Sequence, residues 1–259
     1  MDLNMRTESD RQWAIQGFDA NYEEYKPDYP KELIKTIINK GNLTAGSKLL
    51  EIGSGTGRAT VQFTDLGFEI VCIEPSIDMI DRAKTKLKDT NIEFFGFPFE
   101  EYAEPSEYFD TVISAQAWHW VSQPIGFEKC ANALKKGGYF APFWNINIFL
   151  RDVDIDRELW AIIEKYRGMV SCVPEEYYLK RKEAIISKIT DSDLFSKPEV
   201  MHFYKEMNFT ADGYYNYMDK GHLTDAEKQV CHEELVQLAE KYNGIQRKFH
   251  YELYLTQKI

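Results

Sequence analysis

Three glycines at alternate positions follow a short apolar segment in the first quarter of the chain. Residues 49–57 read LLEIGSGTG, which places Gly53, Gly55 and Gly57 directly after a hydrophobic run. Glycine lets the backbone turn sharply and lets a ligand approach where a Cβ would otherwise stand. In open α/β sheets the ligand lies at the carboxyl ends of the strands. The segment therefore predicts a nucleoside-cofactor cradle made of a strand, a tight turn and a helix.

The glycine spacing departs from two common phosphate-binding signatures. The dinucleotide fingerprint Gly-x-Gly-x-x-Gly requires a third glycine where this chain has Arg58, counted from Gly53, or Thr60, counted from Gly55. The sequence also contains no Gly-Lys-Ser/Thr phosphate loop. A cofactor that is held by its phosphates is therefore disfavoured.

Two acids flank the predicted turn. Glu51 stands immediately before it, where a carboxylate would repel a pyrophosphate but suits a ligand with an ammonium group. Glu74 ends the next apolar segment, and an acid at that place can accept hydrogen bonds from both hydroxyls of a ribose. The pair indicates a positively charged nucleoside without phosphate.

The elements that must position these residues alternate between short apolar strands and helices. This alternation implies βαβ crossovers and a mostly parallel sheet, which makes the fold α/β and doubly wound. The predicted strands cover 48–52, 69–73, 92–95, 111–114 and 139–144, and the predicted helices between them cover 58–66, 75–88 and 127–134, the last stopped by Gly137 and Gly138.

We expect a single domain, residues 1–259, with helical additions to this core. The core covers about 30–146 and 199–259, an N-terminal helical cap covers 1–29, and a helical insertion or lid covers about 147–198.

The C-terminal part returns to the alternating pattern. A strand is predicted at 199–208, and Thr210 and Thr224 are N-cap candidates for two helices, the second with the form of a capping box. Residues 245–256 alternate apolar and polar side chains, which is typical of a half-buried final strand.

The pattern Glu-x-Gly-x-Gly-x-Gly of residues 51–57 resembles the first motif of the class I S-adenosylmethionine-dependent methyltransferases. Residues 98–100 resemble their segment over the adenine, 109–120 resemble the fourth strand with its loop, and 133–139 resemble the helix–turn–strand that follows. The resemblance implies a seven-stranded, Rossmann-like methyltransferase sheet. It also implies S-adenosyl-L-methionine as the cofactor, which carries a sulfonium, an amino group and no phosphate.

Two segments narrow the resemblance within this superfamily. Residues 22–30 and 115–120 resemble the group that contains trans-aconitate methyltransferase and related small-molecule methyltransferases. Lys26 stands where that group usually has arginine, so the charge is kept but bidentate carboxylate recognition is lost.

The resemblance implies a set of cofactor-binding residues. Lys26 would meet the methionyl carboxylate unless its segment simply packs on the sheet edge, Gln116 would bond the methionyl group, and Met79 would pack under the adenine or in the core. The residues expected to contact the cofactor are Tyr22, Lys26, Glu51, Gly53, Ser54, Gly55, Gly57, Glu74, Pro75, Met79, Phe99, Glu100, Gln116 and Trp120.

His119 is the one candidate for a catalytic role. It follows the fourth predicted strand, near the place of the transferred methyl group, and could act as a general base or contact the substrate. Methyl transfer is an in-line displacement on an activated sulfonium, so proximity and alignment can supply most of the acceleration. We therefore favour substrate contact over proton transfer.

The composition limits the partners. The formal net charge is −11, and nucleic-acid binders carry an excess of lysine and arginine, so neither nucleic acid nor an anionic membrane is expected as a partner. The four cysteines and the histidines other than His119 show no metal-ligand spacing, and no metal site is expected. We expect a cytoplasmic monomer or homodimer with a small-molecule methyl acceptor.

Three functions remain open from the sequence. The first is transfer of a methyl group to an oxygen, nitrogen or carboxylate of a small molecule. The second is a non-catalytic S-adenosylmethionine-binding regulatory or scaffold protein, and the third is a nicotinamide oxidoreductase, which the glycine spacing opposes.

Overall fold

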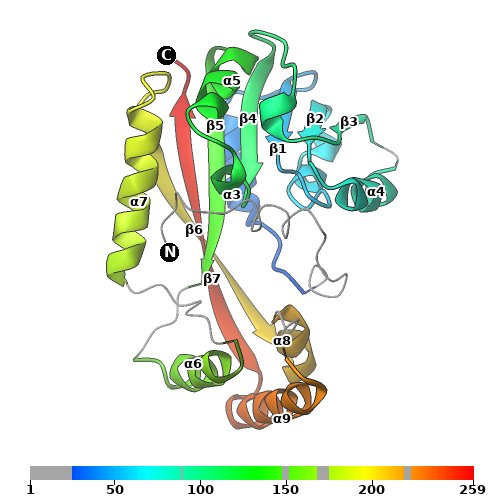
Figure 1. Cartoon of the computed structure of the whole chain (residues 1–259), viewed down its shortest axis with the longest axis vertical. Coiled ribbons are helices and arrows are strands. Elements are labelled where there is room, and N and C mark those ends of the chain that lie inside the picture. Colours follow the sequence, from blue (N-terminus) through cyan, green and yellow to red (C-terminus); the bar gives the residue numbers. More distant parts are fainter. Residues whose placement is uncertain (1–24, 89, 148–151, 168–174, 219–222) are drawn as a thin grey trace.

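The computed structural model describes residues 25–88, 90–147, 152–167, 175–218 and 223–259. Its centre is a seven-stranded sheet with the strand order β3-β2-β1-β4-β5-β7-β6 (Figure 1). The strands are β1 (Lys48–Ile52), β2 (Glu69–Ile73), β3 (Ile92–Phe95), β4 (Phe109–Ala115), β5 (Leu134–Asn147), β6 (Glu199–Phe209) and β7 (Ile245–Gln257). The pairs among β1 to β5 are parallel, whereas β7 is antiparallel to both β5 and β6. This is the predicted doubly wound α/β sheet of the methyltransferase type.

Helices cover both faces of the sheet because the strand residues alternate between two apolar sides. On one face α3 (Lys31–Lys40) packs through Leu33, Ile34 and Ile37. On the other face α5 (Ile125–Ala133) and α7 (Glu175–Thr190) join the cluster of Leu50, Val112 and Phe140. The helix α4 (Ile77–Lys86) follows β2 and buries Met79, Ile80 and Ala83.

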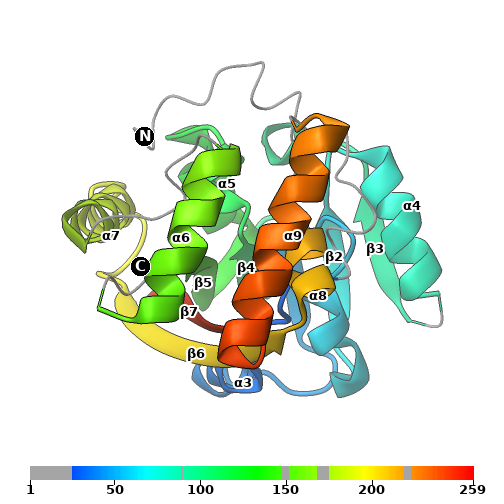
Figure 2. The ribbon, with the colours of Figure 1, turned by 90° about the horizontal axis from the view of Figure 1, so that it is seen from below.

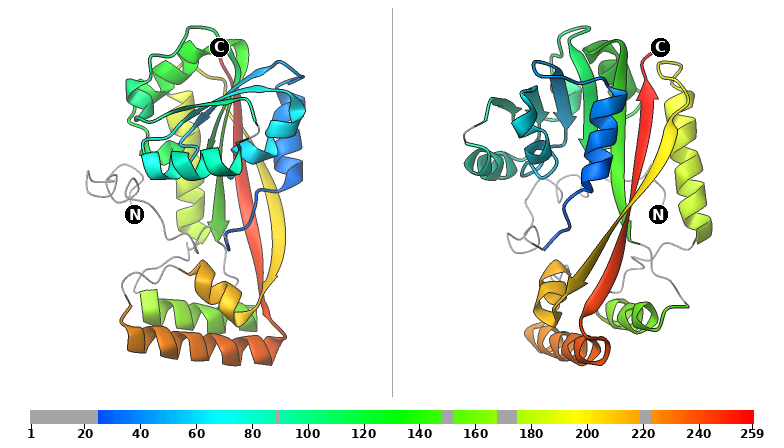
Figure 3. Two further views of the ribbon diagram at one scale, coloured as in Figure 1. Left: turned by 90° about the vertical axis from the view of Figure 1, so that its right-hand side faces the viewer. Right: turned by 180° about the vertical axis from the view of Figure 1, so that it is seen from behind.

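Three further helices gather at the far ends of the long strands β6 and β7 (Figures 1 and 3). They are α6 (Asp154–Arg167), α8 (Ala211–Tyr217) and α9 (Asp225–Tyr242), which we call the lower bundle. Figure 2 shows α6 and α9 beside one another, with α8 next to α9. The segment 147–198, which the sequence presents as one insertion, therefore contains a helix of the lower bundle and a helix that packs on the sheet.

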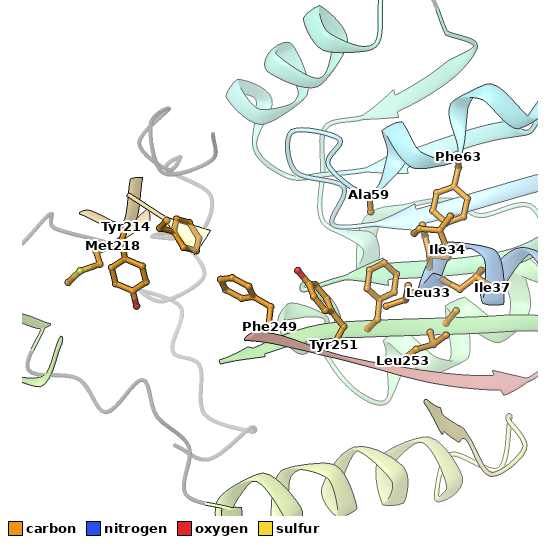
Figure 4. Close-up of a cluster of buried hydrophobic side chains, with 14 of the residues drawn as sticks. Leu33, Ile34, Ile37, Ala59, Phe63, Tyr214, Met218, Phe249, Tyr251 and Leu253 are labelled. Atoms are coloured by element: carbon orange, nitrogen blue, oxygen red, sulfur yellow. The ribbon is translucent and has the colours of Figure 1, made fainter. Parts of the chain in front are cut away.

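The lower bundle is joined to the sheet by apolar and by ionic contacts. Figure 4 shows one continuous buried cluster that runs from Leu33 of α3 past Leu253 and Phe249 of β7 to Tyr214 of α8. Asp156 of α6 pairs with the buried Arg247 of β7, which ties the bundle to the sheet. Within the bundle, Lys241 of α9 pairs with Glu158 of α6 at 2.8 Å. No described helix has both the length and the apolar character needed to cross a membrane.

Two predicted helix boundaries are wrong. Residues 58–66 do not form a continuous helix but two 3-10 turns, Thr60–Gln62 and Thr64–Leu66. The N–H groups of Gln62 and Phe63 bond to carbonyls three residues back rather than four, and Gly67 then turns left-handed. Gly137 and Gly138 do not stop the helix after β4; they lie inside β5, which begins at Leu134. The register between β4 and β5 shifts there, so the glycines occupy an irregularity of the strand.

The C-terminal helices and strands form where the sequence predicts them, but the final strand is more buried than predicted. Thr210 and Thr224 cap α8 and α9, and Thr224 forms the predicted capping box with Glu227. The final strand, however, is buried on both faces from Phe249 to Thr256. It is not half-buried because it lies between β5 and β6 in the interior of the sheet.

Candidate active site

The three glycines after β1 have different reasons to be glycine. All three have positive φ, at 71° for Gly53, 56° for Gly55 and 77° for Gly57. A Cβ at Gly53 would lie 2.2 Å from the Cβ of Ala117, and one at Gly57 would lie 2.7 Å from Leu87 Cδ1. A Cβ at Gly55 would meet nothing nearer than Met79 Sδ at 3.8 Å. Two glycines therefore serve protein packing, and Gly55 leaves room beside the loop that a ligand could use.

Glu51 lies beneath this loop as a buried acid, 1% exposed. The hydroxyl of Thr60 donates to its Oε2 at 2.6 Å. Burial raises the pKa of Glu51 to about 8, with a smaller contribution from the charge of Glu74, while the Thr60 bond opposes the rise. The site therefore keeps a carboxyl group that a cationic ligand would bring into its charged form.

Glu74 is fixed at the end of β2 by two backbone donors. The N–H of Gly55 donates to Oε2 and the N–H of Ser76 donates to Oε1, both at 2.9 Å. Burial raises the pKa of Glu74, and these two bonds partly offset that effect. Each carboxylate oxygen can accept a second bond, so the geometry suits a ribose diol that approaches across the glycine loop.

The other residues expected around the cofactor lie near the same carboxyl ends of the parallel strands. Pro75 follows Glu74, Ser54 is buried in the loop, and Met79 faces Gly55 from α4. Phe99 is buried, with its ring 6.4 Å from that of Trp118.

Glu100 has a partner within the protein. Its Oε1 accepts a hydrogen bond from the N–H of Ser122 at 2.7 Å. The carboxylate thereby holds the segment that follows β4, and any contact with a cofactor would be additional.

The end of β4 is shaped by Gln116. This residue has φ 61°, its N–H donates to Phe143 O at 2.9 Å and its Nε2 donates to Asn145 O at 3.3 Å. The left-handed turn leads into Ala117, which packs closely against Gly53. Gln116 therefore joins the ends of β4 and β5 beside the glycine loop.

His119 and two tryptophans occupy the 3-10 turn Trp118–Trp120 after β4. Trp118 is buried against Phe140, whereas the rings of His119 and Trp120 lie 5.2 Å apart. Trp144 of β5 donates its indole N–H to His119 Nδ1 at 3.1 Å. Because an indole nitrogen is only a donor, this bond places the proton of a neutral His119 on Nε2.

The segment before α3 lies across the strand ends. Tyr22 falls outside the described residues. Arg58 donates to the carbonyl of Lys26 at 2.5 Å and pairs with Asp28 at 3.2 Å, and Tyr251 of β7 donates to Asp28 O at 3.1 Å. The backbone of residues 26–28 is thereby held next to the glycine loop.

Sequence reasoning missed two residues of this region. Tyr29 is buried with its ring 4.9 Å from that of Phe143, and its pKa is raised by burial and by the charge of nearby Glu51. Trp144 is paired with His119. Tyr29 belongs to the segment 22–30 that the resemblance singles out, which could have drawn attention to it. Trp144 belongs to no local motif, and only its position near the end of a strand could have drawn attention to it.

Comparisons with known proteins show the family of the chain. Residues 50–141 match the family model described as a methyltransferase domain. An uncharacterized methyltransferase of Anoxybacillus flavithermus is 30% identical over 179 residues, which are 64% of this chain and 76% of that protein. A Saccharomyces cerevisiae protein, named a probable S-adenosylmethionine-dependent methyltransferase, is 34% identical over 48% of this chain and 44% of its own length.

The chain spans about half the length of the first curated relatives that it matches. One of them, an uncharacterized methyltransferase of Mycobacterium bovis, is 32% identical over 48% of this chain and 49% of its own length.

Solved structures share the fold. The YcgJ protein of Bacillus subtilis superposes with a TM-score of 0.55 at 14% identity, covering 88% of this chain and 99% of that one. The Haemonchus contortus phosphoethanolamine N-methyltransferase 2, solved with S-adenosylhomocysteine, gives a TM-score of 0.54 at 16% identity over 95% of this chain and 58% of its own. The match in sequence and the cradle of the first strand together identify the family: the chain belongs to the class I S-adenosylmethionine-dependent methyltransferases.

Proposed function

We propose that this protein transfers a methyl group from S-adenosylmethionine to an oxygen, nitrogen or carboxylate of a small molecule. The observation that carries the proposal is the place of Gly55. Its missing side chain leaves room beside Met79, its N–H donates to Glu74, and the buried Glu51 lies close enough to Glu74 for the two charges to interact. Two carboxyl groups close to the glycine loop suit a cationic nucleoside better than a pyrophosphate.

The cofactor side of the site follows from these groups. Glu74 would bind the ribose hydroxyls, and Glu51 would stabilise the positive end of the ligand. Met79 and Phe99 would pack against the adenine, while Gln116 and Lys26 would contact the methionyl end. The cofactor supplies a methyl group on a positively charged sulfur, which a nucleophile displaces in line so that S-adenosylhomocysteine leaves.

The acceptor side is proposed to lie beside His119. The bond from Trp144 leaves Nε2 as the protonated nitrogen of a neutral His119, so this nitrogen can donate to an acceptor oxygen but cannot take up a proton. Substrate contact is therefore favoured over general-base catalysis. A carboxylate or a neutral amine needs no proton removed before attack, so alignment by the protein would be sufficient.

The finer assignments are supported by the sequence. Residues 22–30 and 115–120 resemble the trans-aconitate methyltransferase group, which favours a small-molecule acceptor. The net charge of −11 argues against nucleic acid. We propose one methyltransferase domain whose lower bundle contributes to the acceptor side, present as a monomer or a homodimer.

The test is to measure binding and turnover separately. Calorimetry with S-adenosylhomocysteine and with NADH should show one site for the first ligand and none for the second. Incubation with S-adenosylmethionine and a metabolite panel should then release S-adenosylhomocysteine with at least one acceptor. Binding without turnover on any acceptor would favour the non-catalytic scaffold, and preferential binding of NADH would refute the cofactor assignment.

A further inference from the structure

A polar cluster lies on one face of the antiparallel pair β6 and β7. His202 of β6 is directly opposite Glu252 of β7, and His250 is two residues before Glu252. Side chains on a strand alternate between faces, so residues 250 and 252 share a face, and so does the residue paired with 252. The register of the two strands therefore brings two imidazoles and one carboxylate together.

The distances within this cluster are those of a small coordination site. His202 Nδ1 lies 2.9 Å from His250 Nε2 and 3.5 Å from Glu252 Oε1. One donor atom from each residue can be chosen so that all three lie within 4.8 Å of one another. Ligands at about 2.0–2.2 Å from a tetrahedral ion lie roughly 3.3 Å apart, so small side-chain rotations would make the distances equal.

The surroundings orient the carboxylate toward the imidazoles. Glu252 is fully buried, and its Oε2 accepts from Tyr254 OH at 2.9 Å and lies 3.6 Å from Arg181 Nη1. These contacts direct Oε1 toward His202, where Tyr178 also donates to it. Contacts of this kind behind a ligating carboxylate are common around protein metal sites.

The cations near the cluster set the expected affinity. Arg181 near Oε2 opposes a cation, as do Lys182 and Lys248 near His250. We therefore expect moderate rather than very tight binding.

We propose that His202, His250 and Glu252 form a binding site for a divalent transition-metal ion of the Zn²⁺ class that joins β6 to β7. Two imidazoles and a carboxylate suit Zn²⁺, Co²⁺ or Ni²⁺ better than Mg²⁺ or Ca²⁺, which take oxygen ligands. A water molecule would fill the fourth position, and His202 at the open side would be the entry point, since its side chain is 34% exposed. The role is structural, because the methyl transfer itself requires no metal.

The sequence alone argues against this site. His202 lies 48 positions before His250, and the short spacing of His250 and Glu252 supplies only two of the three ligands. Only the pairing of two antiparallel strands brings the three residues together.

The experiment is a metal titration of the full-length protein without a histidine tag after treatment with a chelator. Zn²⁺ is titrated by calorimetry, and Co²⁺ is followed by its visible absorption, which reports a tetrahedral site. The variant is His202→Ala, at a half-exposed position. The matched control is His232→Ala, because His232 is also half-exposed and bonds to an acid, Asp212, but belongs to no three-residue cluster of potential ligands among the described residues.

We expect one ion per chain for the wild type and for His232→Ala. Loss of a residue that only supports a metal ligand already weakens metal binding roughly tenfold. Because His202 is itself a ligand in this proposal, we expect His202→Ala to weaken Zn²⁺ binding by at least that factor. Zn²⁺ should raise the melting temperature of the wild type and of His232→Ala but not that of His202→Ala. The absence of saturable one-to-one binding, or equal binding by the wild type and His202→Ala, would overturn the proposal, and neither result would bear on binding of S-adenosylhomocysteine.

Discussion

The indole N–H of Trp144 donates a hydrogen bond to Nδ1 of His119 across 3.1 Å. This bond joins the end of β5 to the turn after β4, and it selects which nitrogen of His119 carries the proton. The ring of Trp144 is held from its other side by the guanidinium of Arg181, 5.2 Å from the ring centroid, and by the edge of Tyr254. His119 is therefore an oriented ring whose neutral form carries its proton on Nε2.

Replacing Trp144 by Phe tests this orientation. The aromatic packing is largely retained, but the N–H is lost, so His119 can adopt either tautomer. We expect the ¹⁵N spectrum of histidine-labelled protein to show His119 protonated on Nε2 in the wild type and as a mixture in Trp144→Phe. Binding of S-adenosylhomocysteine should change little. A wild-type spectrum with the proton on Nδ1 would contradict the assigned donor role.

Replacing Gly55 by Val should abolish cofactor binding, because the new side chain enters the space beside Met79. The control is Gly46→Val. Gly46 also has a positive φ, at 86°, but a Cβ there meets nothing within 4 Å. Both variants carry backbone strain, so melting temperatures should fall in both. Calorimetry should show lost binding only for Gly55→Val, and unchanged affinity in that variant would refute the cradle.

Replacing Glu74 by Ala should weaken binding of S-adenosylhomocysteine by about 1–3 kcal/mol through the loss of charged hydrogen bonds to the ribose. The comparison ligand is an analogue without the ribose 2′ and 3′ hydroxyls. The wild type should bind this analogue weakly, and Glu74→Ala should discriminate little between the two ligands. An effect below a few tenths of a kcal/mol would mean that the ribose lies elsewhere.

The raised pKa of Glu51, about 8 against an ordinary 4.5, predicts a pH-dependent affinity. A cationic ligand favours the ionised carboxyl, so binding below pH 8 must release a proton from Glu51. Affinity should therefore rise with pH, by up to about tenfold per unit, and level off near pH 8. Glu51→Gln should remove this component, and the difference between the two calorimetric pH profiles isolates it from titration of the ligand's own amino group. Parallel profiles would contradict the role of Glu51.

The raised pKa of Glu51 also affects the stability of the unliganded protein, which should fall with pH where the ligand affinity rises. The native state holds the Glu51 proton up to about pH 8, whereas the unfolded chain releases it near pH 4.5. Between these values the native state binds more protons, so the free energy of unfolding should fall as pH rises from 4.5 to 8 without ligand. Denaturant unfolding of the wild type and Glu51→Gln should show a smaller fall in the variant. A profile with the same slope in both proteins would exclude this contribution.

The sequence by itself determined the strands β1 and β2 and the glycine turn after β1, although not the helix that was predicted to follow that turn. Glu51, the three glycines and Glu74 lie within the short segment from β1 to the end of β2, so their arrangement depends on local periodicity and turn chemistry. The N-caps of α8 and α9 could also be predicted, because a capping side chain bonds to a residue only three positions away.

Only the tertiary structure decided which of these residues face one another and in what chemical state. Whether each of the three glycines serves packing or leaves open space depends on Ala117, Leu87 and Met79, which approach from other elements. The bond between Trp144 and His119 depends on the register of β4 and β5, and the meeting of His202 with His250 depends on the pairing of β6 with β7. These are contacts between segments distant in the chain, and burial, which sets the pKa of Glu51, exists only once such segments have packed.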